Sequence, residues 1–155
     1  MRKRLVTPTP ESILTRSEGW LDIERAAEVE FTSEDEDYPV ESAFAPQEAR
    51  GWRAAGSQTI RLVFDQPQRL RCISLVFEEK ETARTQEFAL RWSPDGGRSL
   101  KEIVRQQWNF SPPETTREVE EYKVELSGVT VLELAIKPSI EGAVARASLK
   151  HLSLS

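Results

Sequence analysis

The feature that most constrains the fold is a period-two alternation of apolar and polar residues, which repeats along the chain after Trp52. Residues 60–64 place Ile, Leu and Phe at every second position, and residues 73–77 do the same. Further stretches of this kind lie at 88–92, 104–110, 122–126, 132–136 and 147–154. Successive side chains of a strand point to opposite faces, so each stretch predicts a strand with one buried face. Seven or so short strands predict an all-β protein, an antiparallel β-sandwich, in preference to an α+β fold.

Some segments leave two assignments open. Residues 100–107 and 119–126 also fit helical spacing, and we predict strand for both. Upstream, residues 10–14 fit a short helix that begins at Pro10, while 21–29 fit either a helix or a strand. The sequence therefore predicts an N-terminal extension, residues 1–30, that packs on or leads into the sandwich, and one sandwich domain, residues 31–155.

The connections between the predicted strands form a short set and a long set. Pro and Gly mark short turns, which are 65–69, 93–99 and 127–129. The long loops are 33–51, 78–86, 111–117 and 138–146. Successive connections of antiparallel strands fall at opposite ends, so the turns are expected at one end and the long loops at the other. A rigid sandwich commonly binds through its longer loops, and we expect a binding site at the long-loop end.

Trp52 and Arg53 come directly after the long loop 33–51, where the predicted strands begin. A tryptophan buries a large apolar area, so Trp52 is expected to plug the end of the core. Arg53, as the next residue of an extended chain, then faces outward. An alternative is that both residues belong to a binding surface.

Five side chains near the long-loop end are candidate ligand contacts: Tyr38, Arg53, Arg84, Trp108 and Asn109. Arg53 and Arg84 are expected to donate hydrogen bonds to hydroxyl groups or to a carboxylate. Tyr38 and Trp108 are expected to stack on a sugar ring, with the Asn109 amide beside it. The alternative for Trp108 is that it continues the inward face of its strand.

Charge and reactive residues limit the possible functions. A net charge of −5 and a pI near 5.1 argue against a nucleic-acid binder. The single cysteine, Cys72, excludes an intrachain disulfide and is predicted to be a buried small apolar residue. One cysteine and one histidine, His151, cannot make a zinc site, and no phosphate-binding loop or triad motif is present. We predict that the protein is not an enzyme and needs no cofactor, and we interpret the acidic run at 34–37 as a solvated surface.

No stretch of the sequence is long and apolar enough for a membrane span. The basic start, residues 1–4, is followed by Thr and Pro and not by the apolar region of a secretory signal. The sequence therefore predicts a cytoplasmic location.

Several segments, in their order along the chain, carry a family resemblance. They are Phe31-Thr-Ser-Glu34, YPVESAF at 38–44, GWRA at 51–54, IRLVF at 60–64, LRCISLVF at 70–77, FALRWSPDGG at 88–97, VTVLELAI at 129–136 and ASLKHLSLS at 147–155. Together they resemble the discoidin, or coagulation factor 5/8 type C, domain. The resemblance covers residues 31–155 and implies a galactose-binding-like jelly roll. It also implies a mostly non-catalytic module that binds glycans, lipid headgroups or proteins through loops at one end.

The chain departs from this family at the positions of its structural calcium. Ala45 stands where many members have an aspartate, and Lys150 and His151 stand where the last strand would carry a glutamate. Calcium binds several oxygen ligands, so a calcium site is disfavoured here, although one of three other carboxylates could substitute. These carboxylates are Asp37, Glu41 and Glu48.

The resemblance and the residues lead to two predictions of function. The first is a non-catalytic module that binds a carbohydrate or a glycan-like ligand through the loops at one end. The alternative is an intracellular protein–protein interaction or scaffold domain with the same fold, which the free Cys72 and the missing calcium aspartate favour. An isolated apolar patch on a sheet face would discriminate for this alternative.

Overall fold

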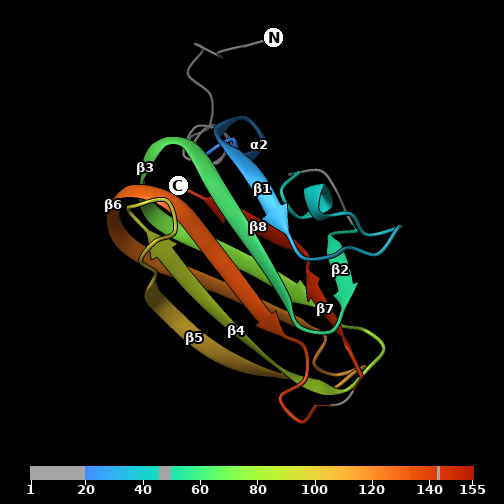
Figure 1. The fold of residues 1–155 in the computed structure, drawn as a ribbon. Coiled ribbons are helices and arrows are strands. Elements are labelled where there is room, and N and C mark those ends of the chain that lie inside the picture. The colour runs from blue at the N-terminus through green and yellow to red at the C-terminus, as the bar shows by residue number, and fades with distance from the viewer. Residues whose placement is uncertain (1–19, 46–49, 143) are drawn as a thin grey trace, which may run out of the picture.

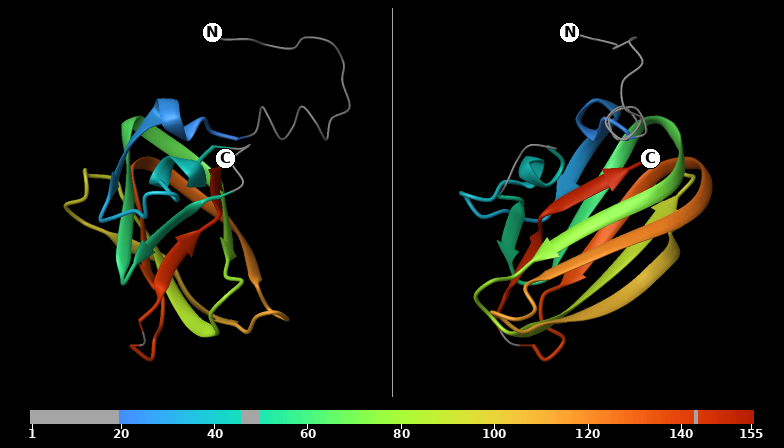
Figure 2. Two further views of the ribbon diagram at one scale, coloured as in Figure 1. Left: turned by 90° about the vertical axis from the view of Figure 1, so that its right-hand side faces the viewer. Right: turned by 180° about the vertical axis from the view of Figure 1, so that it is seen from behind.

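Two long antiparallel strands, β3 (Gln58–Glu78) and β6 (Arg117–Lys137), run side by side through both layers of the molecule. The structure is a computed structural model that describes residues 20–45, 50–142 and 144–155 (Figure 1). The ladder between β3 and β6 shifts its register between Val63 and Cys72. Around these shifts both strands curve from one layer to the other (Figure 2). β-bulges increase local twist and bend, which allows one strand to serve two sheets.

One layer has the strand order β1–β3–β6–β4–β5, built with the first half of β3 and the second half of β6. Its other strands are β1 (Ala27–Phe31), β4 (Arg84–Ser93) and β5 (Lys101–Phe110). The opposite layer joins β8 (His151–Leu154) to the second half of β3 and the first half of β6. Two shorter strands, β2 (Trp52–Ala55) and β7 (Arg146–Leu149), pair with each other. The all-β sandwich predicted from the alternation is therefore confirmed.

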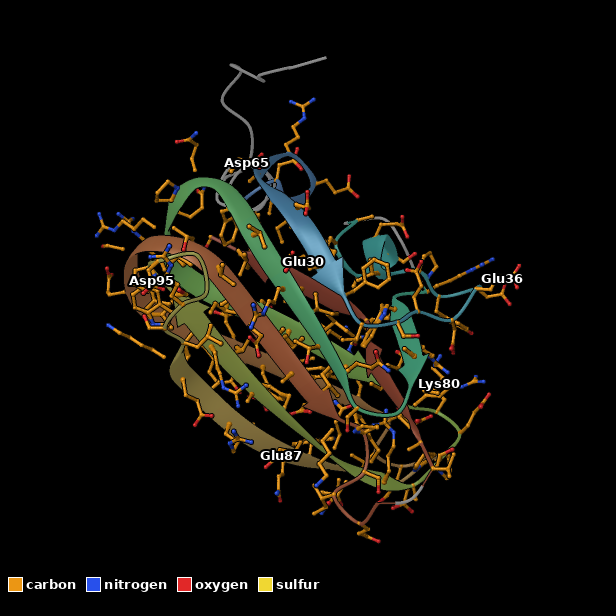
Figure 3. The ribbon with its side chains drawn as sticks, in the orientation of Figure 1. Glu30, Glu36, Asp65, Lys80, Glu87 and Asp95 are labelled. Atoms are coloured by element: carbon orange, nitrogen blue, oxygen red, sulfur yellow. The ribbon has the colours of Figure 1, made fainter. Side chains whose placement is uncertain are left out.

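The predicted turns at 65–69 and 127–129 are wrong as chain reversals. Both segments lie inside β3 and β6, and Gln68 pairs with Val129 across the bend. Pro67 and Gly128 loosen the ladder there, because Pro cannot donate a hydrogen bond and Gly128 has φ of 69°. The bends still lie at one end with the 93–99 turn, since Gly96 N donates to Thr130 Oγ1 at 2.9 Å. Figure 3 shows Asp65 and Asp95 at this end and Lys80 far from both.

Three of the long loops meet at the opposite end, as predicted. Glu79 N donates to Thr116 O at 2.8 Å, and Ile140 N donates to Thr85 O at 3.0 Å. The fourth, the loop that follows β1, instead lies along β2. Asp35 N donates to Arg53 O at 2.7 Å, so the loop covers the flank of the sandwich.

Both segments with ambiguous spacing are strands, within β5 and β6. Residues 21–29 are split between the short helix α2 (Ile23–Ala26) and β1, which pairs with β3. The 3-10 helix η1 (Val40–Ala43) follows in the loop after β1. The helix expected at 10–14 lies outside the described residues. In the part of the chain that the structure describes, no helix is long and apolar enough to cross a membrane.

The core lies between the two layers and follows the predicted inward faces. Phe88 of β4 packs on Phe77 of β3 with ring centroids 5.0 Å apart, and on Tyr122 of β6 at 6.5 Å. Trp52 is fully buried, which confirms that it plugs the core. Cys72 is only half-buried, because Ile73 and Leu75 occupy the inward positions and Cys72 points outward. The prediction of a buried cysteine is therefore wrong.

Candidate binding surface

The loop after β1 is fastened to β2 by Trp52 and Arg53. The buried Trp52 indole donates from Nε1 to Ser33 O at 2.9 Å. Arg53 N donates to Tyr38 O at 3.3 Å. Because Trp52 points inward, Arg53 points to the outside, as alternation along a strand requires. These contacts bring the side chains of Arg53 and Tyr38 together.

The Arg53 guanidinium stacks on the Tyr38 ring, with Cζ 4.8 Å from the ring centroid. The negative face of the ring attracts the cation. Both residues are half-buried. The guanidinium makes no hydrogen bond or ion pair with another described residue. Its N–H donors therefore have no acceptor among the described residues.

Further charged side chains surround this pair. Glu78, at the end of β3, lies with Oε1 3.6 Å from Lys80 Nζ and 3.7 Å from Lys150 Nζ. A small depression between β2, β3 and β7 is lined by Arg50, Arg53, Glu78 and Lys150, among others. We call the group Tyr38, Arg50, Arg53, Glu78, Lys80 and Lys150 the Arg53 surface.

Arg84 was predicted to contact a ligand, but it lies inside the molecule and does not present its N–H donors to solvent. Its side chain is 1% exposed, and Nε donates to Glu79 Oε1 at 2.8 Å. Nη1 donates to Gln86 Oε1 at 2.8 Å and to Pro138 O at 2.9 Å, and Nη2 donates to Ser148 Oγ at 3.1 Å. The period-two pattern explains the difference, because Arg84 shares the inward face of β4 with Gln86 and Phe88.

The buried pair of Arg84 and Glu79 stays ionised. Burial lowers the pKa of Arg84, with a further contribution from the charge of Arg53, while Glu79 opposes the shift. Burial alone would raise the pKa of Glu79, but the hydrogen bonds from Arg84, Glu81 N and Thr82 N hold it below the usual value. This buried ion pair therefore holds together the loops that lie beneath the Arg53 surface.

Trp108 and Asn109 were predicted to contact the same ligand. In the structure they point to opposite faces of β5 and cannot form one subsite. Trp108 is half-buried and lies opposite Gln86, with its indole packed against the core. Asn109 is exposed and accepts a hydrogen bond from Thr85 Oγ1. The inward alternative for Trp108 is the one that the structure supports.

Of the five predicted contacts, the structure thus brings only Tyr38 and Arg53 together. Sequence reasoning missed Arg50, Glu78, Lys80 and Lys150 as parts of the surface. Arg50 and Lys150 are basic residues beside predicted strands, but nothing in their spacing indicates that β2 and β7 pair. That pairing, Trp52 opposite Leu149, is what places Lys150 near Arg53.

The structure also contains an acid pair that the sequence did not reveal. Burial raises the pKa of Glu118 to about 8, and Glu120 beside it adds to the shift. Glu118 is 1% exposed and faces the core opposite Phe77, so no substrate could reach it in this arrangement. We therefore do not interpret the pair as catalytic.

The carboxylates that could replace the missing calcium ligands are Asp37, Glu41 and Glu48. Glu48 lies outside the described residues. Among the residues the structure does describe, no three His, Cys, Asp or Glu side chains gather in a way that could hold a metal ion.

Comparison with known proteins defines the fold class. No family model and no curated protein matches the chain. The fold is similar to the family 32 carbohydrate-binding module of C. perfringens NanJ in complex with galactose, at 12% identity and a TM-score of 0.65, covering 87% of this chain and 96% of that one. The family 32 module of AlyQ in complex with 4,5-unsaturated mannuronic acid gives 14% identity, a TM-score of 0.63 and coverage of 84% and 95%.

A factor 5/8 type C domain from Bacteroides fragilis is also similar, at 13% identity and a TM-score of 0.59, with 87% of this chain and 93% of that chain covered. These likenesses show the fold. The chain has the same β-sandwich fold as these domains.

Proposed function

We propose that the protein is a non-catalytic module that binds a carbohydrate at the Arg53 surface. The observation that carries the proposal is the Arg53 guanidinium, held on Tyr38 at 4.8 Å with no described hydrogen-bond partner of its own. Such a group can donate to sugar hydroxyl or carboxylate oxygens without first breaking a hydrogen bond to a described residue. Two similar folds were solved with sugars bound, which supports the choice of ligand class.

The surface also provides other groups that sugar recognition uses. The exposed Lys80 is a donor at its rim, and Glu78 is an acceptor between two lysines. Below it, Arg84, Glu79 and Ser148 form a buried hydrogen-bonded network that fixes β4 against β7. A rigid support of this kind lowers the cost of ordering side chains on binding.

A glycan array with the purified protein tests the proposal, run once with calcium and once with a chelator. We expect wild-type protein to bind a defined class of glycan, Arg53→Ala to weaken binding about tenfold or more, and Tyr38→Ala to weaken it about three- to tenfold. Arg98→Ala is the matched control, because Arg98 is exposed in the 93–99 turn at the opposite end. Binding that survives both substitutions would place the site elsewhere. Folded protein that binds no glycan in either buffer would contradict the proposed function.

The alternative function, a protein-interaction domain, was expected to show one apolar patch on a sheet face. The exposed large apolar side chains of the described residues are Phe31, Val119, Ile140 and Val144. They lie on β1, on β6 and in the loop between β6 and β7. Because they are distributed over three separate elements, we favour the carbohydrate-binding function.

A further inference from the structure

We propose that the interior of the sandwich binds one water molecule, which accepts hydrogen bonds from Gln86 and Trp108 and donates one to Glu118. The site lies between the two layers, next to the loop 111–117 that joins β5 to β6. It includes none of the residues of the Arg53 surface, so the inference does not depend on the proposed function.

The first argument is a group of buried polar atoms without partners. Gln86 Nε2, Trp108 Nε1 and both carboxyl oxygens of Glu118 are buried and have no hydrogen-bond partner among the described residues. The Gln86 and Glu118 residues are 0% and 1% exposed, so bulk solvent does not reach them. Buried polar groups in folded proteins are nearly always satisfied, either by the protein or by ordered water.

The second argument is that these atoms belong to one part of the interior. Gln86 and Trp108 lie opposite each other in the ladder of β4 and β5. Glu118 lies opposite Phe77 in the other layer. Phe77 packs on Phe88, which is two residues from Gln86 along the same face of β4, with ring centroids 5.0 Å apart. The three polar side chains therefore approach this region from both layers.

The third argument is the direction of the donors. Arg84 Nη1 donates to Gln86 Oε1 at 2.8 Å. Because an arginine can only donate, the amide oxygen of Gln86 faces Arg84, and the NH2 group is the end that remains for another partner. The indole Nε1 of Trp108 can also only donate. The two groups cannot bond to each other, and both require an acceptor.

Glu118 supplies the acceptor on the opposite layer. Burial and the neighbouring Glu120 raise the pKa of Glu118 to about 8, so the carboxyl group is protonated at neutral pH. Its proton is used in the hydrogen bond with Glu120, which also accepts from the Tyr122 hydroxyl at 3.2 Å. The other oxygen of Glu118 is then a neutral acceptor that faces the interior.

Two donors and one acceptor match the hydrogen bonds of a single water molecule. The water oxygen accepts from both N–H groups, and one of its hydrogens is donated to Glu118. Buried waters typically make about three hydrogen bonds to groups that otherwise have none. A cation does not fit, because Gln86 and Trp108 present N–H groups to the site. An anion does not fit either, because it would lie beside the acid pair of Glu118 and Glu120.

A crystal structure of the whole chain at neutral pH tests the proposal without any substitution. We expect electron density for one water oxygen about 2.7–3.2 Å from Gln86 Nε2, from Trp108 Nε1 and from one oxygen of Glu118. The proposal is overturned if other buried waters are visible and this one is absent. It is also overturned if both N–H groups donate directly to Glu118.

Oxygen-17 relaxation dispersion gives an independent test in solution, because it counts the waters that stay bound for longer than the protein takes to tumble. Glu118→Met removes the acceptor and keeps a side chain of similar length, so we expect it to lower the count by about one. Glu125→Gln, at an exposed position, is the control and should leave the count unchanged. A folded Glu118→Met variant with the wild-type count would contradict the proposal.

Discussion

Arg84 donates from Nε to Glu79 Oε1 across 2.8 Å, and the two side chains are only 1% and 9% exposed. Three further Arg84 N–H groups donate to Gln86 on β4, to Pro138 in the loop after β6, and to Ser148 on β7. One guanidinium therefore ties together the strands and loops at the binding end. A buried ion pair of this kind is retained only when its hydrogen bonds are satisfied, as they are here.

We predict that Arg84→Met lowers the free energy of unfolding by about 3–5 kcal/mol, because it leaves the Glu79 carboxylate buried without its partner. Urea denaturation measures the change. The control is Arg69→Met, which breaks an exposed pair with Glu125 and should cost less than about 1 kcal/mol. Equal and small effects of the two substitutions would show that the buried network does not stabilise the fold.

The sandwich could be predicted from the sequence because the alternation that indicates it lies within short stretches of the chain. Alternation at 60–64 and 73–77 reports which face of each strand is buried, and the structure has those faces inward. Pro67 and Gly128 indicated an interruption, and an interruption is present. What the sequence could not show is that β3 and β6 continue through it, since a bend and a reversal use the same residue types.

The binding surface was harder to predict because it depends on contacts between distant segments. Tyr38 and Arg53 were chosen from the sequence and lie together. Arg84 was chosen for its loop position, yet its strand register turns it inward. Lys150 reaches the surface only through the pairing of β2 with β7, which no local pattern encodes.

Gly51 precedes β2 in a conformation with positive φ, and it approaches the chain just after β7. A Cβ atom added to Gly51 would lie 2.7 Å from both Leu149 O and Lys150 Cα. We predict that Gly51→Ala destabilises the protein by about 2–4 kcal/mol, the sum of backbone strain and a clash with main-chain atoms. Thermal unfolding followed by circular dichroism measures this.

Gly142 provides a matched control for that substitution. Its φ of +78° is close to the +73° of Gly51, but an added Cβ meets nothing within 4 Å. Gly142→Ala should therefore cost only the strain of positive φ, about 1 kcal/mol. If both variants lose the same stability, the close approach to β7 has no energetic role.

Tyr38 is expected to act on ligand binding through Arg53. Tyr38→Phe retains the aromatic face below the guanidinium, so we predict a change in glycan affinity of less than about threefold. Tyr38→Leu removes the cation–π contact and frees the guanidinium, which should weaken binding by about three- to tenfold. Isothermal titration of both variants with the glycan selected on the array measures the difference. Equal affinities would mean that stacking on Tyr38 does not position Arg53.

The stability of the protein should depend on pH through Glu118. This carboxyl group is buried in the folded protein, and neither of its oxygens accepts a hydrogen bond from a described donor. A hydrogen bond to the neighbouring Glu120 requires a proton. Burial and Glu120 therefore raise the pKa of Glu118 to about 8, against 4.5 for an ordinary glutamate. The folded state holds this proton more tightly than the unfolded chain does.

We predict that the contribution of Glu118 to the free energy of unfolding is greatest below pH 4.5. This contribution falls as the pH rises between about 4.5 and 8, and it levels off above that. The total contribution is on the order of 5 kcal/mol. Glu118→Gln cannot ionise and should flatten this part of the pH profile, measured by urea denaturation from pH 5 to 9. Glu125→Gln, with its exposed side chain, is the control and should keep the wild-type slope. A wild-type slope in Glu118→Gln would show that another group takes up the proton.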